Sequence, residues 1–444
     1  MSTTPLPLAR AASSALPTSH WVALRDTLVH ATQRVPLYGG LSAPEHDADL
    51  ERSCRAALAQ FPLLDKAALR RAFPHRLLPA GESLAALLRD GVIEFVGTSG
   101  TTSERVQVLW HQPWWNAQER AGFALHPLTD RCCSRDDYRE AVLTTPVCSG
   151  NLCHVGALPM AERVVDDHIL FLNQTPDPAL WKDRDVLRMA DELEAFRPHA
   201  IEADPAYLAH FVVRLRALGR APHQPDFVDH SYSFPARAHL AAIRAAFACP
   251  VLDAYGSTEC GFAFMQCEAG RYHHNAHWTH AELLPLDRHA GLEGRAALVL
   301  TTLRNPWLNL VRFDTGDIVR PSTSPCPCGR DDSLVLDALE GRRSDLVAAA
   351  DGRLLTTHAV DRVIGAAEGL LHWRLRQTAP QSFELDLVPM PGAHPDVDAI
   401  TAALAALLGA EPRTTLRTNL PVEGSGKFRL CAALHQDLAE VCRP

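Results

Sequence analysis

Residues 97–108 read GTSGTTSERVQV, a run of glycine and hydroxyl side chains between two apolar segments. The apolar run 92–96 precedes it, and the alternating residues Val106, Val108 and Trp110 follow it. This pattern predicts two strands joined by a loop. Glycine admits backbone angles that are closed to other residues, and hydroxyl groups donate hydrogen bonds to anionic oxygens. The loop is therefore a candidate for wrapping a phosphate chain, with a polar hairpin as the alternative.

Alternating strand and helix patterns between residues 140 and 260 predict a mostly parallel, doubly wound sheet. The expected strands are 141–145, 168–172, 199–203, 226–230 and 250–254. The connecting helices are expected at 186–196, 208–215 and 235–247. In such sheets, ligands bind beyond the carboxyl ends of the strands. Residues 255–259, YGSTE, directly follow the last strand and fall in that position.

From residue 296 to residue 320 the pattern changes to short strands joined by polar turns, which indicates a small antiparallel β subdomain. Residues 340–345, EGRRSD, then interrupt the apolar pattern, so we place a domain boundary there. The residues beyond carry strand, helix and strand patterns of their own, with the clearest helix at 395–408. A length of 444 residues also fits two or three domains.

The composition is that of a globular chain without a strong charge asymmetry. The 43 basic and 52 acidic residues give a formal net charge of -9 and are mixed along the sequence. This argues against nucleic acid and anionic membranes as partners. No apolar run is long enough to span a bilayer, and the N-terminus lacks the apolar core of a signal peptide. We therefore expect a cytoplasmic protein whose 12 cysteines are reduced thiols or metal ligands rather than disulfides.

Three later stretches share the character of the opening loop: YGSTE at 255–259, RFDTGD at 312–317 and EGSGK at 423–427. In order and spacing, the four segments resemble the signature series of the adenylate-forming superfamily. The helical pattern at 21–35, which ends in the turn VPLYGG at 35–40, resembles the N-terminal cap of its phenylacetate-CoA ligases. The resemblance implies an α/β protein whose large N-terminal domain has doubly wound sheets and a small antiparallel β subdomain. It also implies a small, mobile α+β C-terminal domain. We assign residues 1–341 to the first domain and 342–444 to the second.

Members of this superfamily activate a carboxylic acid with ATP and Mg²⁺, release pyrophosphate, and pass the acyl group from acyl-AMP to an acceptor. The resemblance implies an acid-thiol ligase of this kind, with an aromatic acid as substrate and CoA as acceptor. A carrier-protein thiol or an amine stays open as acceptor, and a homodimer stays open as well. A nucleotide-binding protein without turnover is a further alternative, because Ser103, Glu104 and Arg105 replace the usual Gly-Lys-Pro.

The resemblance also assigns roles to residues of the matched segments. Thr258 would contact the α-phosphate, and Glu259 would hold Mg²⁺, a hard cation that favours carboxylate oxygens. Asp317 would accept the ribose hydroxyls with Arg342 beside it, and a turn aspartate that caps its own backbone is the alternative. The other nucleotide contacts expected are Thr98, Ser99, Gly100, Thr101, Thr102, Gly256, Ser257, and Tyr255 against the adenine.

Lys427 lies in the EGSGK turn, where a single exposed lysine would ordinarily be a solvated charge. Its place in the series implies the family's catalytic lysine, which is carried on the mobile C-terminal domain and bridges the substrate carboxylate and the α-phosphate. Asp345 matches the hinge about which that domain turns, and Gly352 matches the segment that approaches the thiol acceptor. Surface turn residues explain Asp345 and Gly352 equally well.

Four side chains that are separated in the sequence have the chemistry of a structural zinc site. Cys267, His273, Cys326 and Cys328 supply three thiolates and one imidazole, which can complete a closed tetrahedral site. The CPCGR stretch that contains the last two cysteines also resembles the cysteine knuckle of phenylacetate-CoA ligase relatives. Scattered buried thiols are one alternative. Another is a different imidazole ligand, chosen among His274, His277 and His280.

By resemblance, the acid pocket is expected after the predicted strands at 141–145 and 199–203. Asn151 and His154 follow the first strand and could face a carboxylate or an aromatic ring, while an internally hydrogen-bonded histidine is the alternative. Asp204 and Tyr207 follow the second strand, where relatives carry small hydroxyl residues. Their polarity favours a polar or amino-bearing acid.

Overall fold

The fold is built around one twelve-stranded sheet that is parallel at one end and antiparallel at the other. The computed structural model describes residues 16–45, 47–98, 106–147, 158–365 and 367–433. Within these residues the strands follow the order β11-β12-β13-β14-β10-β9-β8-β7-β6-β3-β5-β4. The two halves meet at β8 (Val251–Ser257), which pairs in parallel with β7 (Phe227–His230) and antiparallel with β9 (Gly261–Gln266).

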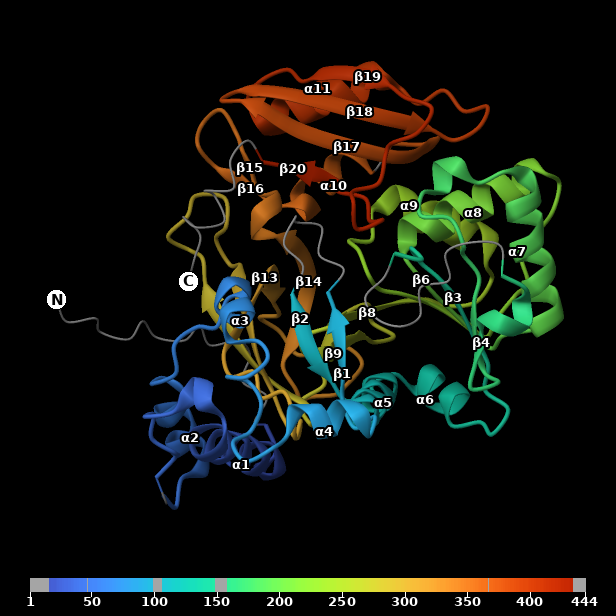
Figure 1. The fold of residues 1–444 in the computed structure, drawn as a ribbon. Coiled ribbons are helices and arrows are strands. Elements are labelled where there is room, and N and C mark those ends of the chain that lie inside the picture. The colour runs from blue at the N-terminus through green and yellow to red at the C-terminus, as the bar shows by residue number, and fades with distance from the viewer. Residues whose placement is uncertain (1–15, 46, 99–105, 148–157, 366, 434–444) are drawn as a thin grey trace.

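The parallel half carries helices on both faces. Figure 1 shows α7 (Asp183–Phe196), α8 (Pro205–Ala217) and α9 (Arg237–Ala246) on one side of these strands, and α5 (Gln112–Phe123) and α6 (Pro127–Cys133) on the other. The remaining strands are β3 (Glu140–Leu143), β5 (Ile169–Phe171) and β6 (Ala200–Ala203), and the short connecting elements are η2 (Met160–Arg163), β4 (Val164–Val165) and η3 (Pro178–Leu180). The predicted doubly wound arrangement is confirmed, with strands and helices close to the expected ranges.

Alternation along each strand decides which side chains meet which helices. Ile201 and Val228 point to one face and pack with Leu208 of α8. Ala200 and Phe227 point to the other face and pack with Phe123 of α5. The two faces therefore have separate apolar cores, and any polar side chain on a strand faces one core or the other.

The antiparallel half continues the same sheet. Its strands are β9, β10 (Tyr272–His274), β11 (Thr279–Pro285), β12 (Ala296–Thr302), β13 (Phe313–Pro321) and β14 (Val335–Arg342). The β subdomain predicted around residues 296–320 is thus present as β12 and β13. It joins the parallel half through β8 because that strand extends through both pairings.

The N-terminal residues cover the antiparallel half. They form α1 (Thr18–Arg34), η1 (Pro36–Tyr38), α2 (Leu50–Leu58), α3 (Lys66–Ala72), α4 (Leu84–Arg89), and the antiparallel pair β1 (Glu94–Gly97) and β2 (Gln107–Trp110). Leu64 forms an isolated bridge with Phe313 of β13, with its backbone N–H donating to Arg312 O at 2.9 Å. This bridge places the first turn of α3 beside the end of the sheet.

The C-terminal residues form a separate small sheet that sits over α8 and α9 (Figure 1). The strands of this sheet, in spatial order, are β19 (Arg413–Leu416), β18 (Ser382–Pro389), β17 (Leu370–Ala379) and β20 (Cys431–Ala432). The other C-terminal elements are η4 (Arg343–Asp345), the separate two-stranded sheet of β15 (Val347–Ala348) and β16 (Leu354–Leu355), α10 (Thr357–Ile364) and α11 (Val397–Leu408). Leu371, Leu420 and Phe428 join the apolar core of α8. The large sheet ends at Arg342, so we keep 341/342 as the proposed division between the domains.

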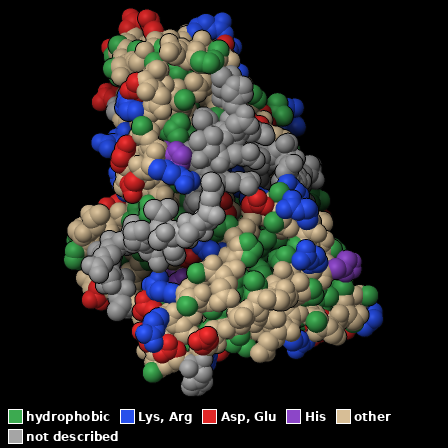
Figure 2. All heavy atoms as spheres, turned by 90° about the vertical axis from the view of Figure 1, so that its left-hand side faces the viewer, with side chains coloured by type: hydrophobic (Ala, Val, Ile, Leu, Met, Phe, Trp, Pro, Cys, Tyr) green, Lys and Arg blue, Asp and Glu red, His purple; other side chains and the backbone are tan. Residues whose placement is uncertain are grey.

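The described surface is polar and mixed in charge. Figure 2 shows Lys and Arg side chains interspersed with Asp and Glu side chains over the face that it draws, without a continuous area of one sign. Among the described residues, no helix combines the length and apolar character that crossing a membrane requires.

Candidate active site

A crevice lies where the carboxyl end of β8 meets the ends of β13 and β14. Residues from segments that are far apart in the sequence line it, among them Lys66, Tyr232, Glu259, Asp317, Arg342 and Phe428. The position agrees with the general rule that ligands bind beyond the carboxyl ends of parallel strands. The predicted magnesium ligand Glu259 and the predicted ribose ligand Asp317 therefore share one site.

The turn after β8 is held in a single conformation by its own backbone. Gly256 is required there, because a Cβ atom would lie 2.8 Å from the carbonyl oxygen of Gly261. The carbonyl and hydroxyl oxygens of Ser257 accept hydrogen bonds from Cys260 N at 3.2 and 3.1 Å. Thr258 and Glu259 lie within this turn, and Glu259 is only 3% exposed. A rigid turn thus presents the predicted phosphate and metal contacts.

Asp317 is oriented by a tyrosine and an arginine. The Tyr255 hydroxyl donates to Asp317 Oδ2 at 2.6 Å, and Arg342 Nε lies 3.5 Å from Asp317 Oδ1. The arginine is near because the register of β13 and β14 pairs Asp317 with Arg342. Burial, followed by the Asp317 charge, raises the pKa of Tyr255 well above its usual value. The hydroxyl therefore keeps its proton and remains a donor.

Sequence reasoning missed Lys66, the first residue of α3. Its Nζ lies 3.3 Å from Glu259 Oε1. The chain contains three lysines, at positions 66, 182 and 427. Nothing in the local pattern of Lys66 indicates a site, because the residue reaches the crevice only through the bridge between Leu64 and Phe313. A second missed residue is Tyr232, which lines the crevice.

Lys427 is buried next to the crevice rather than solvated, since it contacts the lining residue Tyr232. Its side chain is 7% exposed, and its Nζ donates to Tyr232 O at 2.6 Å. Burial lowers the pKa of Lys427 to about 8, and the charges of Arg342 and Lys66 act in the same direction. The residue therefore carries its proton at neutral pH and loses it more readily than an exposed lysine does.

The loop that carries Lys427 is fixed on both sides. Gly426 has a φ of +78°, and a Cβ atom there would lie 1.9 Å from Thr145 Oγ1, so only glycine fits. Tyr207 Oη lies 2.6 Å from Gly426 O. On the other side, Arg429 Nε donates to Asp345 Oδ1 at 2.9 Å. The predicted hinge residue Asp345 thus contacts the same loop as the predicted catalytic lysine.

Several predicted site residues lie outside the described part of the chain: Ser99, Gly100, Thr101, Thr102, Asn151 and His154. Thr98 is described, and it is 4% exposed. Its Oγ1 accepts a hydrogen bond from Val106 N at 3.2 Å, while Thr98 N donates to Val106 O at 2.7 Å. These bonds close the base of the predicted loop between β1 and β2.

Asp204 and Tyr207 have structural contacts in addition to the pocket role predicted for them. Asp204 Oδ1 accepts from Ala206 N at 2.9 Å and from Tyr207 N at 3.4 Å, so it caps α8. Tyr207 holds the Lys427 loop. Gly352 lies in an exposed turn with a φ of +86°, between β15 and β16. The substrate and acceptor roles of these residues stay predictions.

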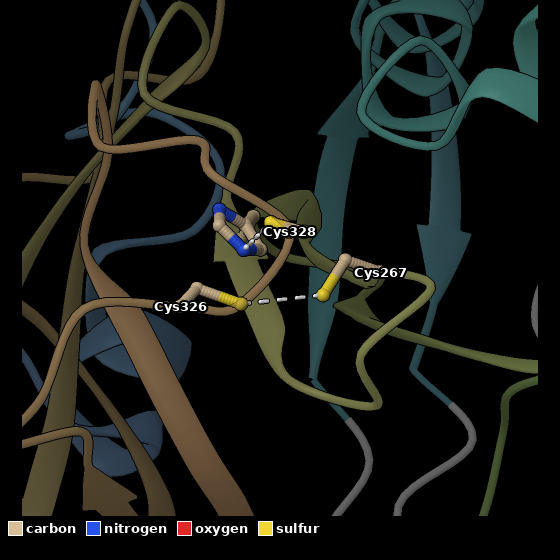
Figure 3. Close-up of side chains that lie close together, drawn as sticks. Cys267, Cys326 and Cys328 are labelled. Atoms are coloured by element: carbon tan, nitrogen blue, oxygen red, sulfur yellow. Dashed lines mark hydrogen bonds between the residues drawn. The ribbon is translucent and has the colours of Figure 1, made fainter.

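The four predicted zinc ligands converge in space, and Figure 3 shows the three cysteines among them, Cys267, Cys326 and Cys328, close together. Their ligand atoms all lie within 4.8 Å of one another. Cys267 Sγ is 3.6 Å from Cys326 Sγ, and Cys328 Sγ is 3.3 Å from His273 Nε2. Two thiolates on a tetrahedral zinc ion are about 3.8 Å apart, so the arrangement fits that metal.

The competing histidines have other partners. His274 Nε2 lies 2.9 Å from Thr279 Oγ1, and His280 Nδ1 lies 2.9 Å from the imidazole of His20. His277 packs edge-on against Trp278. His273, in contrast, points its Nε2 toward Cys328. The geometry therefore selects His273 among the four candidates as the imidazole ligand.

Comparison with known proteins is informative at the level of structure. No protein-family model matches the chain, and no curated protein matches it. A 2-hydroxyisobutyryl-CoA ligase in the postadenylation state, in complex with R3-HIB-AMP, matches with a TM-score of 0.69 and 15% identity over 98% of this chain and 95% of that chain. The protein has the fold of this ligase.

Two further structures with this fold widen the comparison. The same ligase with 2-HIB-AMP and CoA in the thioesterification state has a TM-score of 0.53 and 16% identity, over 97% of this chain and 94% of that chain. The anthranilate CoA ligase AuaEII with anthranoyl-AMP has a TM-score of 0.51 and 13% identity, over 76% of this chain and 65% of that chain. At these identities the likeness concerns the fold, and the chemistry has to be argued from the crevice itself.

Proposed function

We propose that the protein activates a carboxylic acid with ATP, forming acyl-AMP and pyrophosphate, and then transfers the acyl group to a thiol, with CoA as the favoured acceptor. The observation that carries this proposal is that Glu259 and Asp317 line one crevice, and that Lys427 donates to Tyr232, which lines the same crevice. The three residues come from different segments, and the resemblance of those segments to the adenylate-forming signature series implies a role in this reaction for each of them. Unrelated surface turns would not be expected to meet in this way.

The first step requires a cation between two anions, the carboxylate of the substrate and the α-phosphate of ATP. The acid's carboxylate oxygen attacks the α-phosphorus, the bond from that phosphorus to the β-phosphate bridging oxygen breaks, and pyrophosphate leaves. A positioned ammonium group stabilises the negative charge that accumulates as the carboxylate and phosphate approach. The buried Nζ of Lys427 suits this role. Mg²⁺, which the carboxylate of Glu259 would hold, neutralises phosphate charge when bound.

The nucleotide would be held chiefly through Asp317. Tyr255 and Arg342 fix the direction of its carboxylate, and a carboxylate has lone pairs enough to accept two ribose hydroxyls as well. Lys66 places a second cation beside Glu259. This cation offsets the replacement of the usual phosphate lysine by Ser103, Glu104 and Arg105, and it weakens the alternative of a nucleotide-binding protein without turnover.

The proposed second step would require the C-terminal residues to turn about Asp345. That movement would separate Lys427 from Tyr232 O and open the crevice to an acceptor. CoA is favoured because two structures that share the fold, 2-hydroxyisobutyryl-CoA ligase and anthranilate CoA ligase, are CoA ligases. A carrier-protein thiol and an amine are the alternative acceptors, and an aromatic acid is the substrate class that the sequence resemblance favours.

We also propose that Cys267, His273, Cys326 and Cys328 bind a structural zinc ion. Support comes from their three thiols and one imidazole and from the spacing of their ligand atoms. Cys267 follows β9, and the other two cysteines lie between β13 and β14. The ion would therefore clamp together the strands that carry the crevice, without contacting the nucleotide.

Acid-dependent exchange of labelled pyrophosphate into ATP tests the proposal. We expect exchange with at least one member of a broad acid panel, and none when the acid is omitted. Adding CoA, a carrier protein or an amine to the active acid then identifies the acceptor by the product formed. ATP binding without exchange for any acid would contradict the proposal and favour a protein without turnover.

A further inference from the structure

Four acidic side chains lie together at the centre of the parallel half. They are distinct from Glu259 and Asp317, which we call the crevice acids. We call the four the parallel-sheet acids: Glu119 of α5, Glu140 of β3, Glu202 of β6 and Asp229 of β7. Acidic residues are uncommon inside strands of a parallel sheet, which usually carry apolar side chains on both faces. Their position therefore calls for a physical reason.

The strand register places three of them on one face. Glu202 pairs directly with Asp229, while Glu140 pairs with Ala200, two residues before Glu202 on β6. Positions two apart point to the same face of a strand. This is the face that α5 covers, because Phe123 of α5 packs with Ala200. Glu119 belongs to the same helix and completes the group.

The parallel-sheet acids have no basic partner in the part of the chain that the structure describes. Their polar contacts include Tyr138, which donates to Glu140 Oε2 at 2.9 Å, and Ser231, which donates to Glu202 Oε1 at 2.9 Å. Glu202 also forms hydrogen bonds with Glu140 and Tyr232, and Glu119 forms one with Trp115. Asp229 is 1% exposed, and neither of its carboxylate oxygens has a hydrogen-bond partner among the residues that the structure describes. An ionised carboxylate that is buried without a partner is strongly unfavourable.

Each of these carboxyl groups is harder to ionise than usual. Burial, and then the neighbouring charge of Glu202, raises the pKa of Glu119 to about 8. Burial followed by the surrounding acids raises the pKa of Asp229 well above its usual value, and the same is true of Glu140. These carboxyl groups therefore tend to keep their protons in the free protein, and a cation placed beside them would favour their ionised forms.

The group connects directly to the crevice. Ser231, which donates to Glu202, lines the crevice beside Tyr232. Tyr232 O in turn accepts the hydrogen bond from Lys427 Nζ at 2.6 Å. A molecule whose carboxylate lay at Lys427 would therefore have the parallel-sheet acids behind Ser231, on the side away from the nucleotide contacts.

We propose that the parallel-sheet acids bind a cationic group, an ammonium or guanidinium, carried by the acid that this protein activates. This inference rests on the proposed function and names its substrate class: a carboxylic acid with a positive charge remote from the carboxylate. The cation would provide the missing counter-charge for Asp229 and Glu202. Lys427 would then bind the negatively charged end of the substrate, and the parallel-sheet acids would bind its positively charged end.

A metal ion fits this group less well than an organic cation does. Among the described residues, the Cys267 cluster is the one set of potential ligand atoms that lie within 4.8 Å of one another. Neighbouring strands are about 4.8 Å apart, so acids on β3, β6 and β7 spread over roughly 10 Å. An extended group with several N–H donors can reach carboxylates at this spacing, whereas a single ion cannot.

Matched pairs of acids test the inference with the wild-type protein. Each pair has one shape and differs in charge, as 4-(aminomethyl)benzoate and 4-ethylbenzoate do, or 6-aminohexanoate and heptanoate. Hydrogen bonds between charged groups contribute about 1.5–3 kcal/mol. We therefore expect kcat/KM in pyrophosphate exchange to be at least about tenfold higher for the best cationic acid than for its neutral partner.

Two variants test whether the parallel-sheet acids cause the preference for cationic acids over neutral ones. Glu202→Gln and Asp229→Asn keep the side-chain shape and remove the charge, so the preference should fall toward unity while exchange with the neutral partner is retained. That retained exchange also shows that the variants are folded. Glu194→Gln, on the exposed part of α7, is the matched control and should keep the full preference.

The outcomes separate this inference from the proposed function. Exchange with neutral acids but not with their cationic partners would overturn the inference and leave adenylation standing. A preference that survives in both variants would also overturn it, because the cation would then bind elsewhere. Absence of exchange with every acid would overturn both.

Discussion

The crevice acids and the parallel-sheet acids differ in their partners. Glu259 lies 3.3 Å from Lys66 Nζ, and Asp317 lies 3.5 Å from Arg342 Nε. Glu202 and Asp229 lie on the same large sheet, yet their ionised forms face other acids. In both regions the carboxylates are withdrawn from water, but within the described residues only the crevice acids have a basic side chain beside them.

This difference shows how each region can respond to a ligand. A carboxylate that already has a basic partner, such as Glu259, can exchange that partner for Mg²⁺. Asp317 can keep its orientation while it accepts hydrogen bonds from the ribose hydroxyls. In both cases the charge around the carboxylate changes little when the ligand binds. An unpaired and buried carboxylate is held as the acid, and it gains stability only when a cation arrives. The first arrangement suits a constant partner such as a nucleotide, and the second suits selection among substrates.

The largest effect is expected from Lys427→Ala, because Lys427 lies between the two regions. Removal of one positioned charge from a site of this kind typically costs about 100-fold or more in rate. We expect acid-dependent pyrophosphate exchange to fall by at least that factor. Transfer from chemically prepared acyl-AMP to the acceptor should remain close to wild type, because the lysine is proposed to act in the first step only.

Lys182→Ala is the matched control, since Lys182 is exposed at the start of α7. It should leave both half-reactions unchanged. Equal loss of both half-reactions in the Lys427 variant would instead indicate a folding role for the loop.

Lys66→Met tests the pairing of the crevice acids. The variant leaves Glu259 without its nearby cation and removes positive charge from the phosphate region. We expect KM for ATP to rise by about tenfold with a smaller change in kcat, the size typical of one charge-assisted contact. Combination with Glu259→Gln should give less than the sum of the two single effects, because the residues are in contact. Strict additivity would show that the ion pair has no part in ATP binding.

Loss of zinc should affect the crevice acids more than the parallel-sheet acids. The proposed ligands follow β9 and connect β13 to β14, whereas β6 and β7 lie beyond β8. Cys326→Ser is expected to abolish a stoichiometry of about one zinc per chain, to lower Tm by about 5 °C or more, and to weaken ATP binding. Elemental analysis and thermal unfolding provide these measurements.

Cys249→Ser, at a half-buried thiol outside the cluster, is the control for the zinc measurement. It should keep the metal. Protein purified without chelator and found free of zinc would refute the assignment.

The smallest effect concerns stability and pH. The pKa of Glu119 is raised from 4.5 to about 8 by burial and by Glu202, so the folded protein resists the loss of this proton. Such a group favours the fold below its unfolded pKa and loses that contribution as pH rises through the folded pKa. Glu202→Gln removes one repelling charge. Its Tm should therefore exceed the wild-type value by roughly 2 °C near pH 8.5, with a smaller difference near pH 6.

Glu194→Gln again serves as the exposed control and should show no growing difference with pH. A Glu202 variant that is less stable than wild type at the higher pH would mean that the parallel-sheet acids have a counter-charge in the free protein.

The fold can be predicted from the sequence because the patterns that determine it are local. Apolar alternation marks β6, β7 and β8, and the motifs at 255–259 and 312–317 lie on strands that end at the same crevice. Asp317 and Arg342 become neighbours through the register of two adjacent strands, which a motif can specify.

Other parts of the site depend on contacts that no local pattern encodes. Lys66 reaches Glu259 only because Leu64 bridges to Phe313. Asp204 was assigned to the substrate pocket, although Asp followed by Pro at a helix start also indicates a cap, and the structure shows that capping contact. The parallel-sheet acids did leave a signal, an acid within each of three predicted strands or at its edge. The sequence alone does not show that these acids are neighbours. The strand register does, because it places all three on the same face of the sheet.

Transfer of oxygen-18 from the acid to AMP tests the central claim most directly. The protein would be incubated with ATP, an acid labelled at both carboxylate oxygens, and hydroxylamine as acyl acceptor. Attack on the α-phosphorus in the crevice predicts AMP that carries one oxygen-18 atom, together with pyrophosphate and the hydroxamate. Label found in inorganic phosphate with ADP as the nucleotide product, or AMP without label, would contradict the account.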